Sequence, residues 1–306
     1  MDDSLRFLIC LIFLMATVLD TLQKGTDYLV RHGIEEARLN MQLMLAHALK
    51  CDRMQLYLDF DRELDEPVLE RLRDLVKRRG KGDPLQHLLG TVEFLGREFN
   101  TDARALIPRP ETEELCDRLM RRAGWPQGLR LLDVGTGSGV IGLTLLDRWQ
   151  SVGATGVLAD LSPDALELAR ENAALLGLGP PVVEFVRSDL FSGLGEPALS
   201  ERFDLIVANL PYIPASEITD LSREVRKDPE MALLGGEVGT EIMERLLLAC
   251  GPWLRPGGVV ALEYGIGQGP ALQSMAESAG LYSIQLVKDL TGTERFLFAV
   301  KPTESA

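Results

Sequence analysis

The stretch Leu129-Arg-Leu-Leu-Asp-Val-Gly-Thr-Gly-Ser-Gly139 decides the fold of this chain. Its first half, to Val134, is a short apolar run, typical of a parallel strand that is buried on both faces. Its second half is rich in glycine, which lets the backbone turn sharply and approach a ligand closely. A helix is predicted from Gly139 to Trp149, and the N-terminus of a helix attracts negative charge. The stretch therefore predicts a strand, a ligand-binding turn and a helix.

Strands and helices alternate from here to the C-terminus. Strands are predicted at 129–134, 155–160, 182–188, 203–208 and 258–264, with a closing pair at 281–287 and 295–300. Helices are predicted at 139–149, 162–176, 240–250 and 268–279. This alternation predicts an α/β fold, a doubly wound sheet with right-handed crossovers. Ligands of such sheets bind at the carboxyl ends of the strands, near the point where the strand order reverses.

Residues 15–90 have a different pattern, with apolar residues at helical spacing, and predict a small helical domain. One helix opens at Asp65-Glu66-Pro67 and ends at Gly80, and Asp83-Pro84 is predicted to cap a shorter one. The basic cluster Arg71–Lys81 is either a solvated helix face or a contact surface for RNA or an acidic partner. Residues 91–108 predict a β-hairpin connection, so that the α/β domain spans 109–306.

The overall composition excludes several classes of protein. The chain carries 46 acidic and 32 basic residues, a formal charge of -14, and 46% of its residues are hydrophobic. The hydrophobic content excludes a wholly disordered chain. The negative charge makes the chain unsuited to coating DNA or RNA, because such binding requires cations that displace phosphate counterions. The cysteines and histidines lie far apart in no ligand pattern. We therefore expect no metal site and reduced thiols in a cytoplasmic, monomeric protein.

The N-terminus carries an uncharged apolar run at residues 7–19. It is shorter than the roughly 20 residues of a membrane-spanning helix, so we expect no membrane association. The start Met-Asp-Asp also lacks the basic region of a signal peptide. We treat residues 1–14 as an apolar extension, with Met15 as an alternative start.

The ligand of the glycine turn is predicted to carry adenosine. Asp160 ends the next strand, about 20 residues after the turn, where its carboxylate can accept both ribose hydroxyls. The pattern Gly137-x-Gly139-x-x-Gly142 also fits a dinucleotide such as NAD. Asp133, however, lies inside the strand just before the turn, where it would repel pyrophosphate but suit a cationic ligand. This favours S-adenosyl-L-methionine.

A second motif, Asn209-Leu-Pro-Tyr212, follows the strand at 203–208 and is expected at the reacting group. An amide or exocyclic amine nitrogen is a poor nucleophile because its lone pair is delocalised. The Asn209 side-chain oxygen and the Leu210 carbonyl can accept its two N–H bonds and support the developing charge. Tyr212 can stack on the planar group, and Pro211 biases Leu210 to extended geometry.

Together these motifs resemble the HemK/PrmC family, the release-factor glutamine N5-methyltransferases, over about residues 16–302. The resemblance rests also on Pro84–Gly90, Leu106-Ile-Pro-Arg-Pro-Glu-Thr-Glu113 and Asp289–Gly292. It implies a class I, Rossmann-like, seven-stranded methyltransferase domain, preceded by a helical domain that docks the substrate. It also implies transfer of a methyl group to the glutamine of the Gly-Gly-Gln motif in class I release factors, with S-adenosyl-L-homocysteine as product.

The resemblance assigns roles to individual residues. Gly135, Thr136, Gly137, Ser138 and Gly139 would hold the amino-acid end of the cofactor and Asp160 the ribose. Asp189 and Leu190 would contact the adenine, and Asn209 would lie between cofactor and substrate. Asn209, Leu210, Pro211 and Tyr212 would bind the glutamine side chain, with Asn209 and Tyr212 as catalytic residues.

Other functions remain open at this point. A glutamine amide and an adenine amino group present similar edges, so a ribosomal-protein glutamine methyltransferase or a nucleic-acid adenine methyltransferase would use the same motif. The acidity of residues 101–306 weighs against the second. A nicotinamide-dependent oxidoreductase is disfavoured by Asp133, and a non-catalytic adaptor by the complete motif at Asn209–Tyr212.

Overall fold

The computed structural model describes residues 16–196 and 202–303. The predicted extension at residues 1–14 lies outside these ranges. The chain divides into two compact units, one formed by residues up to Gly90 together with Ser222–Lys227, and the other by Thr91–Leu221 and the residues from Asp228 on. Among the described residues, no helix is long and apolar enough to cross a membrane.

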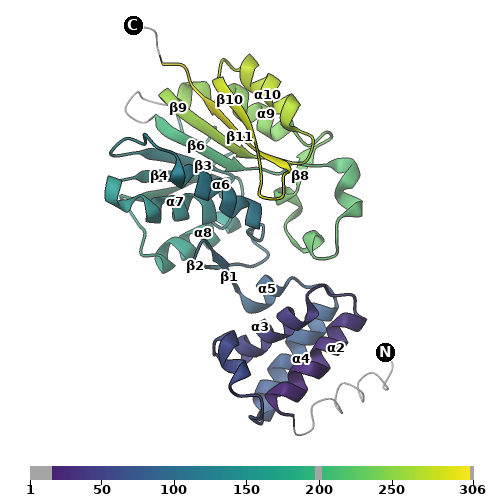
Figure 1. Ribbon diagram of the computed structural model, residues 1–306. Helices are drawn as coiled ribbons and strands as arrows, with labels where there is room; N and C mark the ends of the chain where they lie inside the picture. The colour runs from purple at the N-terminus through teal and green to yellow at the C-terminus, as the bar shows by residue number, and fades with distance from the viewer. Residues whose placement is uncertain (1–15, 197–201, 304–306) are drawn as a thin grey trace. The chain divides into compact units, whose positions relative to one another are not determined.

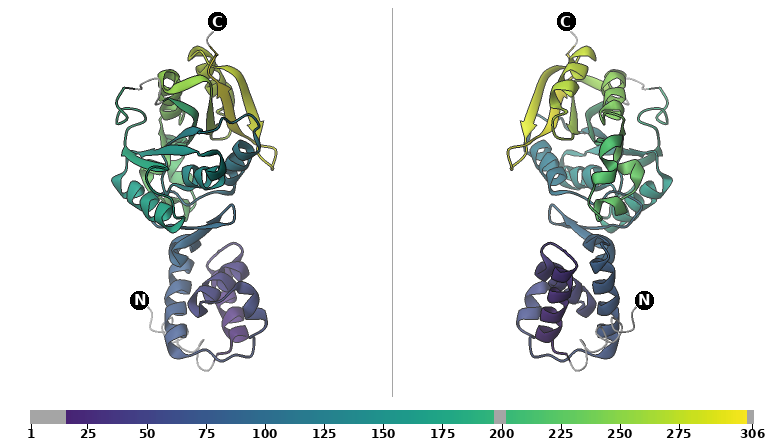
Figure 2. Two further views of the ribbon diagram at one scale, coloured as in Figure 1. Left: turned by 90° about the vertical axis from the view of Figure 1, so that its left-hand side faces the viewer. Right: turned by 90° about the vertical axis from the view of Figure 1, so that its right-hand side faces the viewer.

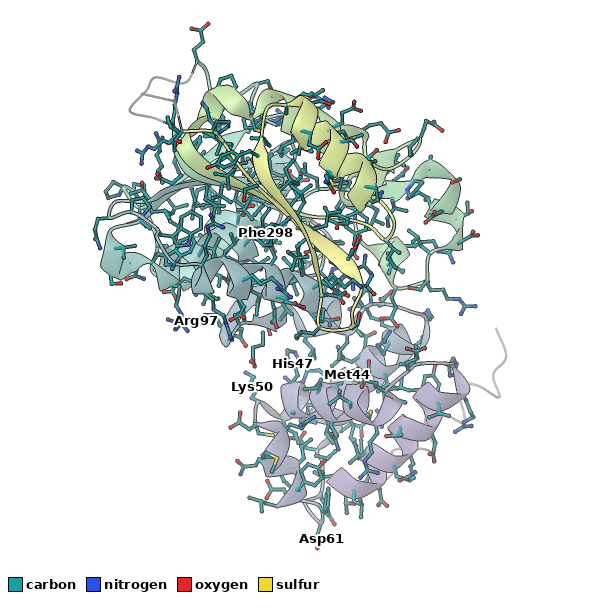
Figure 3. All side chains as sticks on the ribbon, turned by 45° about the horizontal axis from the view of Figure 1, so that its top comes forward. Met44, His47, Lys50, Asp61, Arg97 and Phe298 are labelled. Atoms are coloured by element: carbon teal, nitrogen blue, oxygen red, sulfur yellow. The ribbon has the colours of Figure 1, made fainter. Side chains whose placement is uncertain are left out.

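The first unit is helical, as predicted for this part of the chain. It contains α2 (Val18–Arg31), α3 (Ala37–Leu49), the 3₁₀ helix η1 (Arg53–Tyr57), α4 (Glu66–Gly80), α5 (Leu85–Leu89) and η5 (Val225–Lys227). Its core is a cluster of buried aliphatic side chains from α2, α3 and α4, among them Leu22, Met44 and Leu72. Met44 of α3 is labelled in Figure 3. The Asp65 carboxylate caps α4 by accepting the Val68 N–H at 3.1 Å.

Arg79, within the basic cluster, is buried rather than solvated, with 4% of its surface exposed. Its guanidinium donates to the Asn40 side-chain oxygen (2.6 Å), the Asp83 carbonyl (3.1 Å) and the Glu224 carboxylate (2.6 Å). A solvated face is therefore the wrong interpretation for this one residue. The cap predicted for α5 is also wrong, because the Asp83 side chain pairs with Arg78 and Lys227 instead.

The second unit contains the predicted sheet, which has seven strands in the order β10-β11-β9-β6-β3-β4-β5. The strands are β3 (Arg130–Val134), β4 (Thr155–Asp160), β5 (Val183–Arg187), β6 (Phe203–Asn209), β9 (Leu254–Glu263), β10 (Tyr282–Lys288) and β11 (Glu294–Val300). From β9 to β5 all neighbours are parallel, and β11 is antiparallel to β9 and β10. The α/β fold class predicted from the alternation is confirmed.

Helices cover both faces of this sheet (Figures 1 and 2). They are α6 (Pro110–Arg121), α7 (Val140–Arg148) and α8 (Pro163–Leu175) on one face and α9 (Glu241–Ala249) and α10 (Gly269–Ser278) on the other, with η2 (Gln150–Val152) and η7 (Gly251–Trp253) in connections. Two cores result, one holding Leu115 and Leu143 and the other Leu246 and Leu272. Phe298 of β11, labelled in Figure 3, belongs to the first. Burial on both faces explains why the central strands are apolar throughout.

Two smaller sheets complete the second unit. The predicted hairpin is confirmed as β1 (Thr91–Phe94) and β2 (Arg97–Asn100). The sequence did not predict the parallel pair β7 (Ile213–Pro214) and β8 (Leu234–Gly236), which brackets η4 (Ala215–Asp220) and η6 (Glu230–Ala232). The β7–β8 pair matters for the site because β7 directly follows Tyr212.

We expect the substitution Asp65→Ala to lower the free energy of unfolding by about 1 kcal/mol, because the Val68 N–H loses its partner at the start of α4. Urea denaturation followed by circular dichroism would measure it. The matched control is Asp74→Ala, which removes the same charge from an exposed position of α4, 3.8 Å from Arg78. Exposed pairs of this kind are worth a few tenths of a kcal/mol, so equal losses in the two variants would contradict the role of the cap.

Candidate active site

The site lies where the strand order reverses. After β3 the chain adds β4 and β5 on one side, and then returns to place β6 on the other side of β3. Val134 pairs with Ala208 in the register of β3 and β6, so the glycine turn and Asn209 leave the sheet side by side. Asn209 pairs in turn with Glu263, the last residue of β9. This is the crevice in which doubly wound sheets bind their ligands.

The glycine turn is shaped so that larger residues do not fit. Gly135 has a φ of +70°, and a Cβ there would lie 2.7 Å from Cδ2 of Leu210. Gly139, at φ +85°, would meet Leu143 Cδ1 at the same distance. Both positions combine a left-handed backbone with close packing, which glycine alone tolerates without strain. The turn is thus a cradle that presents backbone to a ligand.

The turn, β6 and two distant segments enclose a cavity of about 230 Å³. Among the residues predicted for the site, the cavity is lined by Gly135, Gly137, Asp160, Asp189, Leu190, Asn209, Leu210 and Pro211. Asp160 accepts the Gly137 N–H at 2.8 Å and the Ser162 N–H at 2.8 Å, so its carboxylate also holds the turn against β4. Asp189 forms a 2.8 Å ion pair with Arg245 at the cavity wall.

Four predicted site residues do not line this cavity. Ser138 is buried, and Gly139 is the N-cap of α7. The Thr136 hydroxyl is turned inward and donates to Asp133 at 2.6 Å. Tyr212 lies beyond the cavity, where its carbonyl accepts from the Gln268 side chain at 2.8 Å and a Cβ on Gly265 would lie 3.0 Å from its ring. Burial raises the pKa of the Tyr212 phenol, which therefore stays protonated.

Asp133 lies beneath the turn rather than in the cavity. One carboxylate oxygen accepts both the Thr136 hydroxyl (2.6 Å) and the Gly142 N–H (2.9 Å). The other is buried without a hydrogen-bond partner among the residues described. Burial raises the pKa of Asp133 to about 6, against the two hydrogen bonds that lower it. The carboxylate is thus largely ionised at neutral pH, and its negative charge lies next to the ligand-binding turn.

Asn209 is held by a small buried network. Its side-chain nitrogen donates to the Thr112 hydroxyl at 3.1 Å, and that hydroxyl donates to the Glu263 carboxylate at 2.8 Å. The Asn209 side chain also lies near the Glu263 carboxylate and lowers its pKa. Burial raises the pKa of Glu263 to about 7. Thr112 comes from α6, so three separate elements meet at this amide.

Several residues of the site were not predicted from the sequence. Arg104–Leu106 line the cavity together with Pro229, Met231 and Ala232, and neither segment was predicted to do so. Asp228, whose side chain is fully buried, accepts from the Ile107 N–H (3.3 Å) and the Arg109 guanidinium (2.8 Å) and so ties the two segments together. Glu263 could have been predicted from the sequence, because it is a carboxylate at the end of an apolar strand, at the edge of the sheet where ligands bind.

Comparison with known proteins agrees with this geometry. A methyltransferase domain model matches residues 126–236, which hold the turn, Asp160 and the Asn209 motif, and a PrmC N-terminal domain model matches residues 20–90. The chain is an S-adenosyl-L-methionine-dependent methyltransferase of the Rossmann-like class.

Its relatives narrow this class. Proteins named release factor glutamine methyltransferase from Deinococcus radiodurans, Geobacter sulfurreducens and Rhodopirellula baltica are 39%, 38% and 39% identical to it. The alignments cover 92%, 91% and 92% of this chain and 97%, 95% and 95% of those proteins. The chain belongs to the release factor glutamine methyltransferase family.

The residues present fit this cofactor. Gly135 and Gly137 line the cavity and carry no side chains, so a ligand can approach the backbone of the turn closely. The unpartnered oxygen and the charge of Asp133 suit the cationic methionine end, where pyrophosphate would be repelled. Asp160 lines the cavity and keeps lone pairs for hydroxyl groups.

The variant Asp133→Asn tests the raised pKa. An amide oxygen can accept both hydrogen bonds at this position without carrying charge. The pKa of this carboxyl is about 6 in the folded chain, against 3.8 for an ordinary aspartate side chain. The folded state therefore binds more protons between these values, and the stability of the natural chain falls as pH rises through them.

We expect the free energy of unfolding of Asp133→Asn, relative to the natural chain, to increase between about pH 4 and 6, by at most about 3 kcal/mol, and then to level off. Urea denaturation across this range measures the difference. A difference that does not change with pH would contradict the raised pKa.

Proposed function

We propose that this enzyme transfers a methyl group from S-adenosyl-L-methionine to the side-chain amide nitrogen of the glutamine in the Gly-Gly-Gln motif of class I translation release factors. The observation that carries the proposal is that Asn209 lines the cavity while its side-chain nitrogen is bound by the Thr112 hydroxyl. The names of the relatives support the same substrate.

The cofactor would be held by backbone and carboxylates. In this proposal the turn Gly135–Gly139 holds the amino-acid end through Gly135 and Gly137, which line the cavity. Asp160 accepts the ribose hydroxyls, and Asp189 and Leu190 contact the adenine. When bound, S-adenosyl-L-methionine supplies a sulfonium methyl group, which the glutamine nitrogen takes by direct displacement to leave S-adenosyl-L-homocysteine. Leu190 suits the adenine because it is buried and lines the cavity.

The substrate amide would be oriented by two acceptors. The Asn209 side-chain oxygen and the Leu210 carbonyl take its two N–H bonds, which points the nitrogen lone pair at the methyl group and stabilises the positive charge that develops. The methylated nitrogen is acidic and releases its proton to water, so a strong base is not required. Tyr212 stacks on the amide plane, and Pro211 keeps the turn extended.

Leu210 stands where the commoner motif has proline. The acceptor is a backbone carbonyl, so the exchange keeps it. The Leu210 side chain is 5% exposed and lies against Gly135. Packing of the Leu210 side chain therefore helps to restrain the turn, as a proline ring at this position would.

The helical unit, residues 15–90, would dock the release factor, and the α/β domain would carry the chemistry. We also propose that the enzyme acts as a cytoplasmic monomer without stable nucleic-acid binding. The formal net charge of -14 supports the absence of stable nucleic-acid binding, because such binding needs positive charge. Within the basic cluster, Arg73 and Arg78 already pair with Glu66, Asp74 and Asp83, which lowers its free positive charge.

The substitution Asn209→Ala should abolish methyl transfer, by at least about a thousandfold in kcat, and leave affinity for S-adenosyl-L-homocysteine within a few-fold. Incubation with radiolabelled cofactor and purified release factor measures the first, and calorimetry the second. Near-natural turnover would refute the role of Asn209.

The same assay separates the substrates when ribosomes and DNA replace the release factor. Label on the release factor alone supports the proposed function. Label on a ribosomal protein or on DNA alone would replace it with one of the two alternative methyltransferase activities.

A further inference from the structure

Thr112 stands out because it lies in the segment Leu106–Glu113, which carries much of the family resemblance but has no assigned role. Its side chain is buried, with 3% of the residue exposed. Its hydroxyl lies between the Asn209 amide (3.1 Å) and the Glu263 carboxylate (2.8 Å). A buried hydroxyl between an amide and a carboxylate has a defined direction of donation, and this direction has a consequence for the reaction.

The direction follows from the number of protons available. Above its pKa of about 7 the Glu263 carboxylate is ionised, and an ionised carboxylate accepts hydrogen bonds and cannot donate them. The single proton of the Thr112 hydroxyl therefore goes to Glu263, and its oxygen accepts from Asn209. The group that Asn209 presents to Thr112 must then be its nitrogen, which lies 3.1 Å from the hydroxyl oxygen. Rotating the amide by 180° would place its oxygen against a hydroxyl oxygen and a carboxylate, both of them acceptors.

We propose that Thr112 and Glu263 are positioning residues that lock the Asn209 amide with its oxygen facing the substrate and its nitrogen facing the protein. The proposal rests on the proposed role of Asn209 as acceptor of a substrate N–H. Neither residue touches the reacting atoms. Their effect is to make the site offer two acceptors, the Asn209 oxygen and the Leu210 carbonyl, to an incoming amide.

This lock also determines specificity. A glutamine side chain brings two N–H donors to the two acceptors, whereas a glutamate side chain brings a carboxylate that both acceptors repel. If the Asn209 amide were free to rotate, its N–H would face the substrate in part of the molecules and would bind a carboxylate. The lock therefore separates glutamine from glutamate as well as orienting the nucleophile. An unpaired buried polar group disfavours the wrong ligand strongly.

The parallel register explains how the lock is built. Asn209 and Glu263 are cross-strand partners at the ends of β6 and β9. Pro110 starts α6 immediately before this site, so Thr112 lies in the first turn of the helix and enters between the two strand ends. Each of the three elements supplies one member.

The test compares Thr112→Val, which keeps the shape and removes the hydroxyl, with Thr112→Ser, which keeps the hydroxyl. Three quantities are measured: kcat and KM on the release factor, affinity for S-adenosyl-L-homocysteine, and affinity for the release factor relative to a version with Gly-Gly-Glu in place of Gly-Gly-Gln. Thr144→Val is the matched control, because Thr144 is also a buried helical threonine, on α7, and its hydroxyl has no hydrogen-bond partner among the described residues.

We expect Thr112→Val to lower kcat about tenfold or more, the equivalent of ~1.4 kcal/mol. The preference for the natural release factor over its Gly-Gly-Glu version should fall by a similar factor. Affinity for S-adenosyl-L-homocysteine should stay within about twofold. Thr112→Ser and Thr144→Val should behave like the natural enzyme. A merely structural role for Thr112 would not change the preference for glutamine over glutamate.

Glu263→Gln provides a second variant, which keeps the proposal testable should Thr112→Val fail to fold. Its side-chain amide can donate to the Thr112 hydroxyl, which frees the hydroxyl proton for the Asn209 oxygen and so stabilises the rotated form. We expect the same fall in kcat and in discrimination. Natural kcat and discrimination in Thr112→Val or, if that variant does not fold, in Glu263→Gln would overturn the lock. Failure of the natural enzyme itself to label the release factor would instead overturn the proposed function.

Discussion

The register between β6 and its two parallel neighbours is the constraint on which the site depends. Through it Val134 lies beside Ala208 and Asn209 beside Glu263, so three carboxyl ends arrive together. A slip of one residue would exchange the faces of every side chain along β6 and send Asn209 to the other side of the sheet. Both faces of β6 are buried, from Phe203 to Ala208, so such a slip would be costly everywhere along the strand. The catalytic geometry is therefore fixed by ordinary core packing.

The elements that the sequence predicts well are those with local causes. The apolar run before Gly135, the Ser162-Pro163 start of α8 and the Asp65 cap all act within a few residues, and each is present in the structure. Most predicted strands and helices begin and end within a few residues of the observed ones. Eight of the twelve predicted site residues meet at the cavity for the same reason, because strand ends of one sheet share an edge.

What the sequence did not reveal depends on partners far away along the chain. Asp228 meets Ile107 and Arg109 across about 120 residues, and Thr112 meets Glu263 across about 150. No local pattern encodes such a pair. Arg79 shows the same limit, since its cationic neighbours suggest a solvated helix face while its burial follows from Asn40 and Glu224. The segment Leu106–Glu113 could be recognised by its resemblance to the family. The contacts that explain why these residues are needed, from Ile107, Arg109 and Thr112, form only in the folded chain.

The segment Ser222–Lys227 has a consequence for how the chain can be divided. It belongs to the helical unit, while the residues on both sides of it belong to the α/β unit. The backbone therefore passes from one unit to the other three times, at residues 90–91, 221–222 and 227–228, and neither unit is one uninterrupted stretch. A single cut after Gly90 would yield two pieces, of which the first keeps the buried Arg79 guanidinium without the Glu224 carboxylate. The two units are therefore not successive segments joined end to end, because each is built from two separate stretches of the chain.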